Sequence, residues 1–150
     1  NGKLRGCIGS STRQRPLAED VAANGYAAAF KDPRFTALAK DELDGLAVSV
    51  SVLSPSHPMT FADEDDLRGQ LRPGTDGLVI MDGKHRALFL PSVWESLPTR
   101  ELFFGHLKAK AKLGKDHWSD GFKAWRFVAE EISSSTLGEA VSLWSMSRKN

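Results

Sequence analysis

A single turn signal restricts the fold of this chain more than any other feature. The segment GLVIMDGKHRALFLP, residues 77–91, places apolar stretches on both sides of Asp82-Gly83. An Asp-Gly pair between such stretches is the strongest short-range hairpin signal, because these residues accept the positive φ values of a tight turn. The segment therefore predicts two antiparallel strands joined at this pair, and an antiparallel sheet around them.

Three further segments have the alternation of strands. LAVSVSVLSP, residues 46–55, places valines on one face and serines on the other. FKAWRFVAEEI, residues 122–132, predicts a final strand. LRGCI, residues 4–8, predicts a strand with Arg5 and Cys7 side by side on one face, ended by Gly9-Ser10-Ser11.

Capping residues and prolines predict the helices. Pro16 suits the first turn of a helix that runs to Phe30. The segment 63–71 predicts a short helix with acidic residues at its N-terminal end. Thr99 caps a helix over residues 100–113, with Gly114 as its stop. For the first helix we expect core contacts from Leu17, Val21, Tyr26, Ala27 and Phe30.

Helices and strands do not alternate as a parallel sheet requires. The class is therefore α+β, with a mainly antiparallel sheet and flanking helices. A chain of 150 residues fits one domain. We expect this domain over residues 1–132, as one body or as two lobes. Residues 133–150 are then a tail or a short amphipathic helix with Leu137, Val141 and Trp144 on one side.

Charge and composition exclude several classes of function. The net charge of +1 offers no field for nucleic acid, and the lysines at 108, 110 and 112 fit a solvated helix face. No apolar run has the length of a membrane span, and no signal peptide opens the chain. One cysteine cannot form an internal disulfide, so nothing in the composition calls for an oxidising compartment. The expected location is cytoplasmic or otherwise intracellular.

The single cysteine is the leading candidate for chemistry. A nearby cation favours the reactive thiolate, and Arg5 is close enough on the predicted strand to hold an anionic group. Gly6, Gly9 and Ser10 complete a candidate binding loop, because a glycine-serine turn exposes backbone N–H groups. The alternative is structural: a free cysteine often packs as a small hydrophobe, and the glycines then admit close backbone contacts.

A partner base for Cys7 is not evident. The four histidines, His57, His85, His106 and His117, are all distant from it in sequence, and each fits a solvated or packing role. No pair has the spacing of metal ligands, and the acidic run 63–66 fits a solvated helix cap. We therefore predict no metal and no cofactor.

Two other places qualify as candidate binding residues. Asp76-Gly77 follows RPGT and forms a turn at the start of a strand, where Asp76 caps the turn or orients a pocket group. Arg34, in KDPRF, either pairs with Asp32 across a helix end or faces the Cys7 pocket.

The chain contains seven motifs in a fixed order: LRGCIGS (4–10), AAFKDPRF (28–35), VSVSVLSP (48–55), RPGTDGLVI (72–80), RALFLPSVWESLP (86–98), FFGHLKAKAKL (103–113) and DHWSDGFKAWRFVAEEI (116–132). Together they resemble the AMMECR family, whose microbial members are called AmmeMemoRadiSam system protein A. The resemblance implies an intracellular α+β domain with a larger sheet-bearing lobe and a smaller subdomain. It also implies Memo-like and radical-SAM proteins as partners, and no defined reaction.

Family members usually carry a helix and a strand before the glycine-cysteine motif, and here only two residues precede it. Relative to the usual domain the sequence is N-terminally shortened, and the sequence leaves open whether these elements were removed or lie on another chain. If they are absent, the predicted strand 4–8 has a free edge through which we expect copies of the chain to associate.

Two functions stay open at this stage. In the first, a pocket around LRGCIG binds a small ligand or a partner protein, and the domain has no reaction of its own. In the second, Cys7 serves a cysteine-dependent enzyme or enzyme subunit that acts with the Memo-like and radical-SAM proteins. The sequence leaves open whether the chain is an enzyme.

Overall fold

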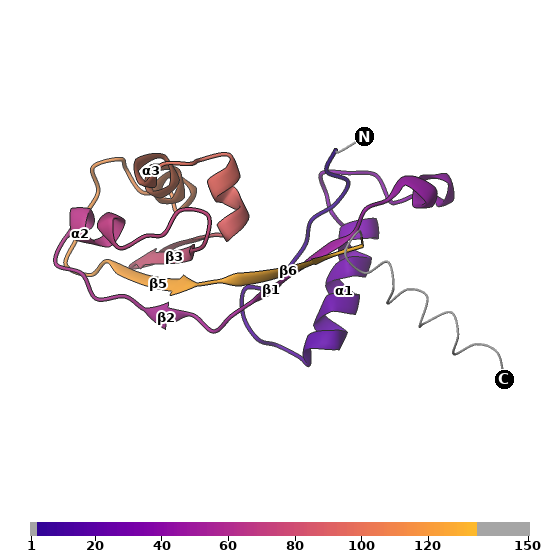
Figure 1. Ribbon diagram of the computed structural model, residues 1–150, viewed down its shortest axis with the longest axis horizontal. Helices are drawn as coiled ribbons and strands as arrows, with labels where there is room; N and C mark the ends of the chain where they lie inside the picture. Colours follow the sequence, from indigo (N-terminus) through magenta and orange to yellow (C-terminus); the bar gives the residue numbers. More distant parts are fainter. Residues whose placement is uncertain (1–2, 135–150) are drawn as a thin grey trace. The chain divides into compact units, whose positions relative to one another are not determined.

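The computed structural model describes residues 3–134, which form two compact units (Figure 1). The N-terminal unit comprises the described residues up to Val50 together with Ser133 and Ser134, and the central unit comprises Ser51–Ile132. The elements follow in this order: α1 (Leu17–Phe30), η1 (Lys40–Gly45), β1 (Ser49–Leu53), β2 (His57–Pro58), α2 (Glu64–Gly69), β3 (Gly77–Asp82), β4 (His85–Phe89), η2 (Pro91–Glu95), α3 (Arg100–Lys110), β5 (Lys123–Phe127) and β6 (Ala129–Ser133).

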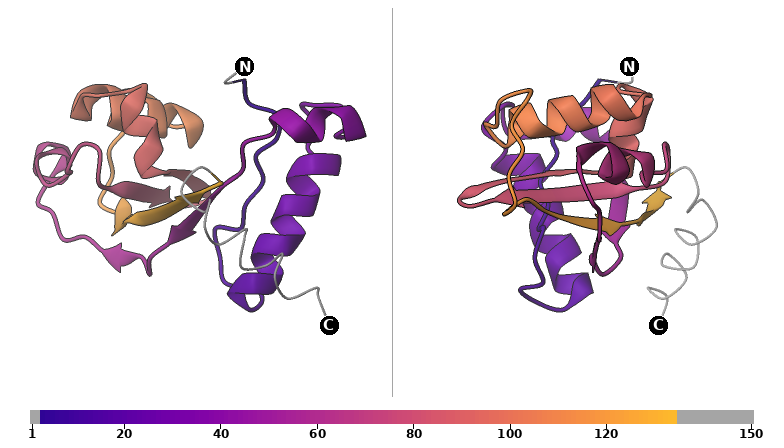
Figure 2. Two further views of the ribbon diagram at one scale, coloured as in Figure 1. Left: turned by 45° about the vertical axis from the view of Figure 1, so that its right-hand side comes forward. Right: turned by 90° about the vertical axis from the view of Figure 1, so that its left-hand side faces the viewer.

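A four-stranded antiparallel sheet organises the central unit, in the order β2-β5-β3-β4. The predicted hairpin is confirmed: Asp82 pairs with His85, and Gly83 takes a φ of 55° in the turn between β3 and β4. Helices α2 and α3 lie on the same face of this sheet (Figures 1 and 2). The predicted α+β class with a mainly antiparallel sheet is therefore confirmed.

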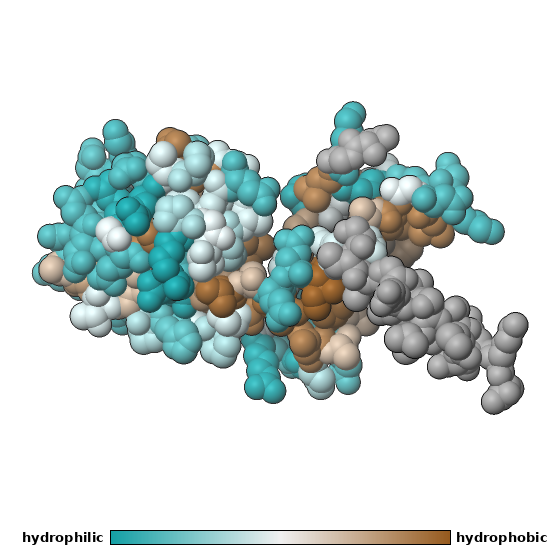
Figure 3. All heavy atoms as spheres, viewed as in Figure 1, coloured by the Kyte–Doolittle hydropathy of each residue, from teal (hydrophilic) through white to brown (hydrophobic). Residues whose placement is uncertain are grey.

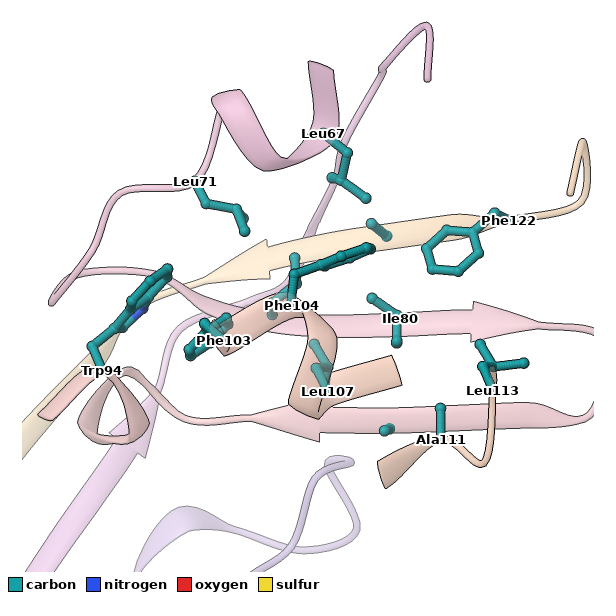
Figure 4. Close-up of a cluster of buried hydrophobic side chains, with 13 residues drawn as sticks. Leu67, Leu71, Ile80, Trp94, Phe103, Phe104, Leu107, Ala111, Leu113 and Phe122 are labelled. Carbon is teal, nitrogen blue, oxygen red and sulfur yellow. The ribbon is translucent and has the colours of Figure 1, made fainter. Parts of the chain in front are cut away.

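The hydrophobic core lies between this sheet and its helices (Figure 4). Leu78 and Ile80 point from alternate positions of β3 into the cluster, and neither is exposed. The indole of Trp94 stacks on the ring of Phe103, with 3.9 Å between ring centroids and 3° between ring planes. The other large members of the cluster are Leu67, Leu71, Phe104, Leu107, Leu113 and Phe122.

Helix α3 begins as predicted and ends early. The hydroxyl of Thr99 accepts a hydrogen bond from the N–H of Leu102, which confirms the cap. The helix stops at Lys110 rather than Leu113, because Lys112 adopts a left-handed φ of 60° and breaks the regular ladder ahead of Gly114.

Lys108 corrects the prediction of a solvated lysine face on α3. Its side chain is 1% exposed, and its ammonium donates to the carboxylate of Glu64 at 2.8 Å. The ammonium also lies 5.7 Å from the ring centroid of Phe104. The carboxylate that makes this burial tolerable comes from α2, 44 residues earlier in the chain, so the local pattern of α3 does not reveal it.

Helix α1 has the predicted bounds but not the predicted contacts. It contains no buried residue, and Leu17, Tyr26 and Phe30 are exposed. The expectation that these three pack into a core is therefore wrong, whereas Val21 and Ala27 are half-buried. Apolar surface is visible on this unit in Figure 3.

The remaining strand predictions need correction. Residues 4–8 form no strand, so the free strand edge from which we predicted self-association is absent there. The strand expected over 46–55 is only Ser49–Leu53. The strand expected over 122–132 divides at Val128, and β6 pairs with β1 in a separate two-stranded sheet. The C-terminal helix expected near Leu137 lies outside the described residues.

Candidate functional site

The segment Leu4–Gly9, called here the Cys7 loop, has an irregular backbone held by side chains of the same unit. Asp32 is the principal anchor. Its carboxylate, which is buried, accepts the backbone N–H of Cys7 at 2.9 Å and the backbone N–H of Arg34 at 3.1 Å. Asp32 follows α1 and opens a turn in which the N–H of Phe35 returns to its carbonyl at 3.1 Å.

Arg34 also binds the backbone of Cys7. Its guanidinium donates to both carboxylate oxygens of Asp32, at 2.9 and 2.7 Å, and to the carbonyl oxygen of Cys7 at 3.0 Å. Of the two alternatives foreseen for Arg34, the pairing with Asp32 occurs, and the same guanidinium also binds the Cys7 backbone; that it faces a ligand pocket stays a prediction. Hydrogen bonds from the Arg34 side chain, then from the Cys7 N–H, hold the pKa of Asp32 far below its usual value.

Arg5 anchors the loop at a second point. Its guanidinium meets both carboxylate oxygens of Glu42, at 2.6 and 2.9 Å, and donates to the carbonyl of Thr36 at 2.7 Å. This pairing, followed by the N–H of Ala39, lowers the pKa of Glu42 to about 2. Among the described residues, Arg34 therefore supplies the guanidinium that contacts Cys7. The Arg5 side chain instead binds Glu42 of η1.

Gly6 and Ser10 fix the loop against α1. A Cβ at Gly6 would lie 2.0 Å from the carbonyl oxygen of Ala28, so only glycine allows the two backbones to approach this closely. The hydroxyl of Ser10 donates to Asp20 at 3.0 Å and accepts from the amide of Asn24 at 3.0 Å. At Gly9, by contrast, a Cβ would meet nothing within 4 Å.

The thiol itself is exposed, while the backbone on both sides of it is bound. Asp32 accepts the backbone N–H of Cys7, and Arg34 donates to its carbonyl. The backbone of Cys7 is therefore held in place while its side chain is exposed to solvent. No histidine occurs in residues 1–50, so these residues supply no imidazole base.

Asp76 and Gly77 lie in the central unit, and their contacts are structural. Asp76 is 0% exposed and pairs with the guanidinium of Arg72 at 2.6 Å, which closes the turn around Gly74. A Cβ at Gly77 would lie 2.3 Å from the ring of Phe127, so the missing side chain makes room for that ring. Sequence reasoning located the turn but not its ion pair.

A polar cluster in the central unit was not predicted. The imidazole of His117 pairs with Asp82 at 2.5 Å, and the hydroxyl of Ser119 donates to the same oxygen at 2.8 Å. These two bonds, that of His117 first, lower the pKa of Asp82. His85 contacts the carbonyl of Ala111 at 3.0 Å. Residues 3–134 contain no group of three or more side chains suited to hold a metal ion.

Comparisons with known proteins match the chain to one family. The AMMECR1 family model matches residues 1–132. Protein MJ0810 of Methanocaldococcus jannaschii is 36% identical over 134 residues, which cover 85% of this chain and 65% of that protein. A protein of Thermotoga maritima is 38% identical over 132 residues, covering 87% of this chain and 70% of that protein.

A solved structure supports the same relationship. The uncharacterized protein PH0010 from Pyrococcus horikoshii aligns with a TM-score of 0.77 and 33% identity, covering 86% of this chain and 64% of that one. The chain thus spans about two thirds of the length of these relatives, whose names state no reaction. Among residues 3–134, no helix has the length and apolarity to cross a membrane. On the family match and these identities, the chain belongs to the AMMECR1 family.

Proposed function

We propose that the Cys7 loop is a recognition surface that binds a small ligand or a partner protein through the shape of its exposed face around position 7 and through the Arg34 guanidinium, with no reaction at sulfur. One observation carries the proposal: the backbone of Cys7 is bound on both sides while its side chain stays exposed. A site whose backbone is fixed in advance loses little conformational entropy when it binds, which favours recognition.

The charge of this surface suits a bound group that is neutral or weakly anionic. Arg34 keeps a side-chain exposure of 54% although it pairs with Asp32, whose side chain is 1% exposed. The guanidinium therefore has a solvent-facing part, and the buried carboxylate balances its charge. A bound group meets a directional donor rather than a strong positive field.

Two substitutions at Cys7 distinguish recognition from catalysis. Cys7→Ser keeps the size of the side chain and removes the thiol, and Cys7→Trp fills the space in front of the loop. Recognition predicts that the serine variant retains cellular function and partner binding and that the tryptophan variant loses both. Thr12→Trp, at an exposed position outside the loop, is the matched control. Loss of function in a folded Cys7→Ser protein would refute the proposal.

The exposed thiol also favours a second candidate function. In this alternative Cys7 is the nucleophile or covalent carrier of an enzyme that acts with Memo-like and radical-SAM proteins, the partners that the family resemblance implies. The Arg34 guanidinium, which donates to the backbone carbonyl of Cys7, is the cation that this alternative would use. Alkylation by iodoacetamide across pH tests this. A thiol that reacts faster than a free model thiol near neutral pH, and slows in Arg34→Gln, supports the enzyme, whereas an ordinary profile removes it.

The same thiol supports a proposal about the location of the protein. A free, exposed cysteine persists in the reducing interior of a cell, whereas an oxidising compartment promotes its pairing or oxidation. We therefore propose an intracellular location. Fractionation of cells that produce the protein, with the thiol state read by alkylation, tests it: an extracellular, oxidised protein would contradict it.

A further inference from the structure

A hollow of about 430 Å³ lies in the central unit, and no residue of the Cys7 loop lines it. It is independent of the function proposed for that loop. Its walls come from the turn after α2, from η2 with the residues before α3, and from strands β1 and β6. Pockets of this volume fall within the range of small-molecule sites. Every lining residue belongs to Ser51–Ile132, so the hollow is complete within one compact unit.

The hollow is held in shape by buried contacts. The indole N–H of Trp94 donates to the carbonyl of Asp76 at 2.7 Å, which ties η2 to the turn containing Pro73 and Gly74. The Asp76–Arg72 ion pair closes that turn, and Gly74 has a φ of 74°. The stack of Trp94 on Phe103 fixes the indole from its other side. The walls are therefore preformed.

The lining combines apolar surface with uncompensated negative charge. Pro73, Pro91 and Pro98 contribute rigid apolar walls beside Trp94. The carboxylates of Glu95 and Glu131 come from different elements, and neither has a hydrogen-bond or ion-pair partner within residues 3–134. No lysine, arginine or histidine lines the hollow. Arg72, which adjoins the lining residue Pro73, forms an ion pair with Asp76.

This combination selects one class of ligand. Two carboxylates without a cation repel anions and attract positive charge. Proline and tryptophan walls accept the aliphatic body to which such a charge is attached. A bare metal ion needs several oxygen ligands, and the described residues offer no such group here.

We propose that this hollow binds a small organic cation, an alkylammonium or alkylguanidinium, with its charge between Glu95 and Glu131 and its aliphatic part against the prolines. The same chemistry also occurs on lysine and arginine side chains of peptides, and the experiment separates that source from a free small molecule.

The test is an NMR titration of the protein with agmatine, which carries both cationic groups on a short aliphatic chain. The indole N–H resonance of Trp94 reports the hollow, and that of Trp125, which does not line it, is the internal reference. We expect a saturable shift of Trp94 alone at millimolar agmatine, and no such shift with n-butanol. Absence of a saturable shift would overturn the proposal.

Isosteric variants test the carboxylates. Glu95→Gln and Glu131→Gln are each expected to weaken agmatine about fivefold, the value of one exposed ion pair. Glu130→Gln is the matched control, because it removes the same charge from the neighbouring position of β6, outside the lining. Equal weakening by Glu130→Gln would overturn the proposal, since only the overall charge would then matter.

A short lysine-arginine peptide is the second arm. A peptide that shifts Trp94 and is displaced by agmatine supports the cation site. The opposite result is a peptide that shifts the Trp94 resonance while agmatine neither binds nor displaces the peptide. That result would overturn the assignment to a small molecule and indicate a peptide-binding groove.

Discussion

Asp32 illustrates how much of the candidate site depends on single residues. Its two carboxylate oxygens accept bonds from the backbone of Cys7, the backbone of Arg34 and the Arg34 side chain. A sequence reading identified the residues of this turn and the pairing of Asp32 with Arg34. The sequence led us to expect Arg5 as the cation beside Cys7, because strand alternation places both residues on one face. The partner that Arg5 binds instead, Glu42, lies 37 residues away and could not be predicted from the local pattern.

The close approach at Gly6 yields the first prediction. A Cβ there would meet the Ala28 carbonyl, which belongs to the α1 backbone and cannot rotate away. Gly6→Ala is expected to lower the stability of the N-terminal unit by about 2 kcal/mol, as overpacking usually does. Gly9→Ala, where space is open, is expected to change it by less than about 0.5 kcal/mol. Amide hydrogen exchange of α1 in the two variants measures both changes, and equal effects would contradict the close contact between Gly6 and Ala28.

The Arg5–Glu42 pair gives a pH dependence. The pKa of Glu42 is about 2 in the folded chain against 4.5 ordinarily, so its contribution to stability is complete above about pH 4.5. That contribution is lost as the pH falls through the folded value. Glu42→Gln is therefore expected to melt below the wild type at pH 6 and together with it near pH 2. A constant difference between their melting temperatures over this range would contradict the pairing.

At the scale of elements, the sequence predicted those helices and strands whose boundaries are set by neighbouring residues. The Asp-Gly turn predicted the β3–β4 hairpin, and Thr99 predicted the start of α3. Alternation in residues 4–8 was misleading, because a strand needs a partner and this segment instead bonds to side chains. The burial of Lys108 was missed for the related reason that Glu64 lies on another helix.

The pairing of β3 with β5 can be tested at Gly77. Its register partner is Phe127, whose ring occupies the space that a Cβ would take. Gly77→Ala is expected to destabilise the central unit by about 2 kcal/mol. Gly105→Ala, inside α3 with open space around it, is expected to stabilise it by about 0.5–1 kcal/mol. Thermal unfolding of the two variants measures the contrast, and a neutral Gly77→Ala would show that the ring packs elsewhere.

Over the whole molecule, burial is distributed unevenly between the two units. All the buried hydrophobic residues of the described chain lie between Leu67 and Phe127, in the central unit. In residues 3–50 the single buried residue is Asp32. Composition could not reveal this imbalance, because α1 is as rich in apolar residues as a core helix but leaves its largest ones exposed.

Unequal burial predicts unequal local stability. Amide hydrogen exchange is expected to be slow in β3 and α3, whose side chains form the core, and faster by at least about tenfold in α1. Mass spectrometry of peptides from the three elements measures this in the intact chain. Equal protection of α1 and β3 would contradict the unequal distribution of stability.

The account as a whole depends on the claim that Asp32 and Arg34 hold the backbone of Cys7 while its thiol remains exposed. The most direct measurement is the hydrogen exchange rate of the Cys7 amide by NMR, in the wild type and in Asp32→Asn. The account predicts a protected amide in the wild type and exchange about tenfold faster or more in the variant, because the acceptor is weakened. A wild-type amide that exchanges at the rate of an unstructured chain would contradict it.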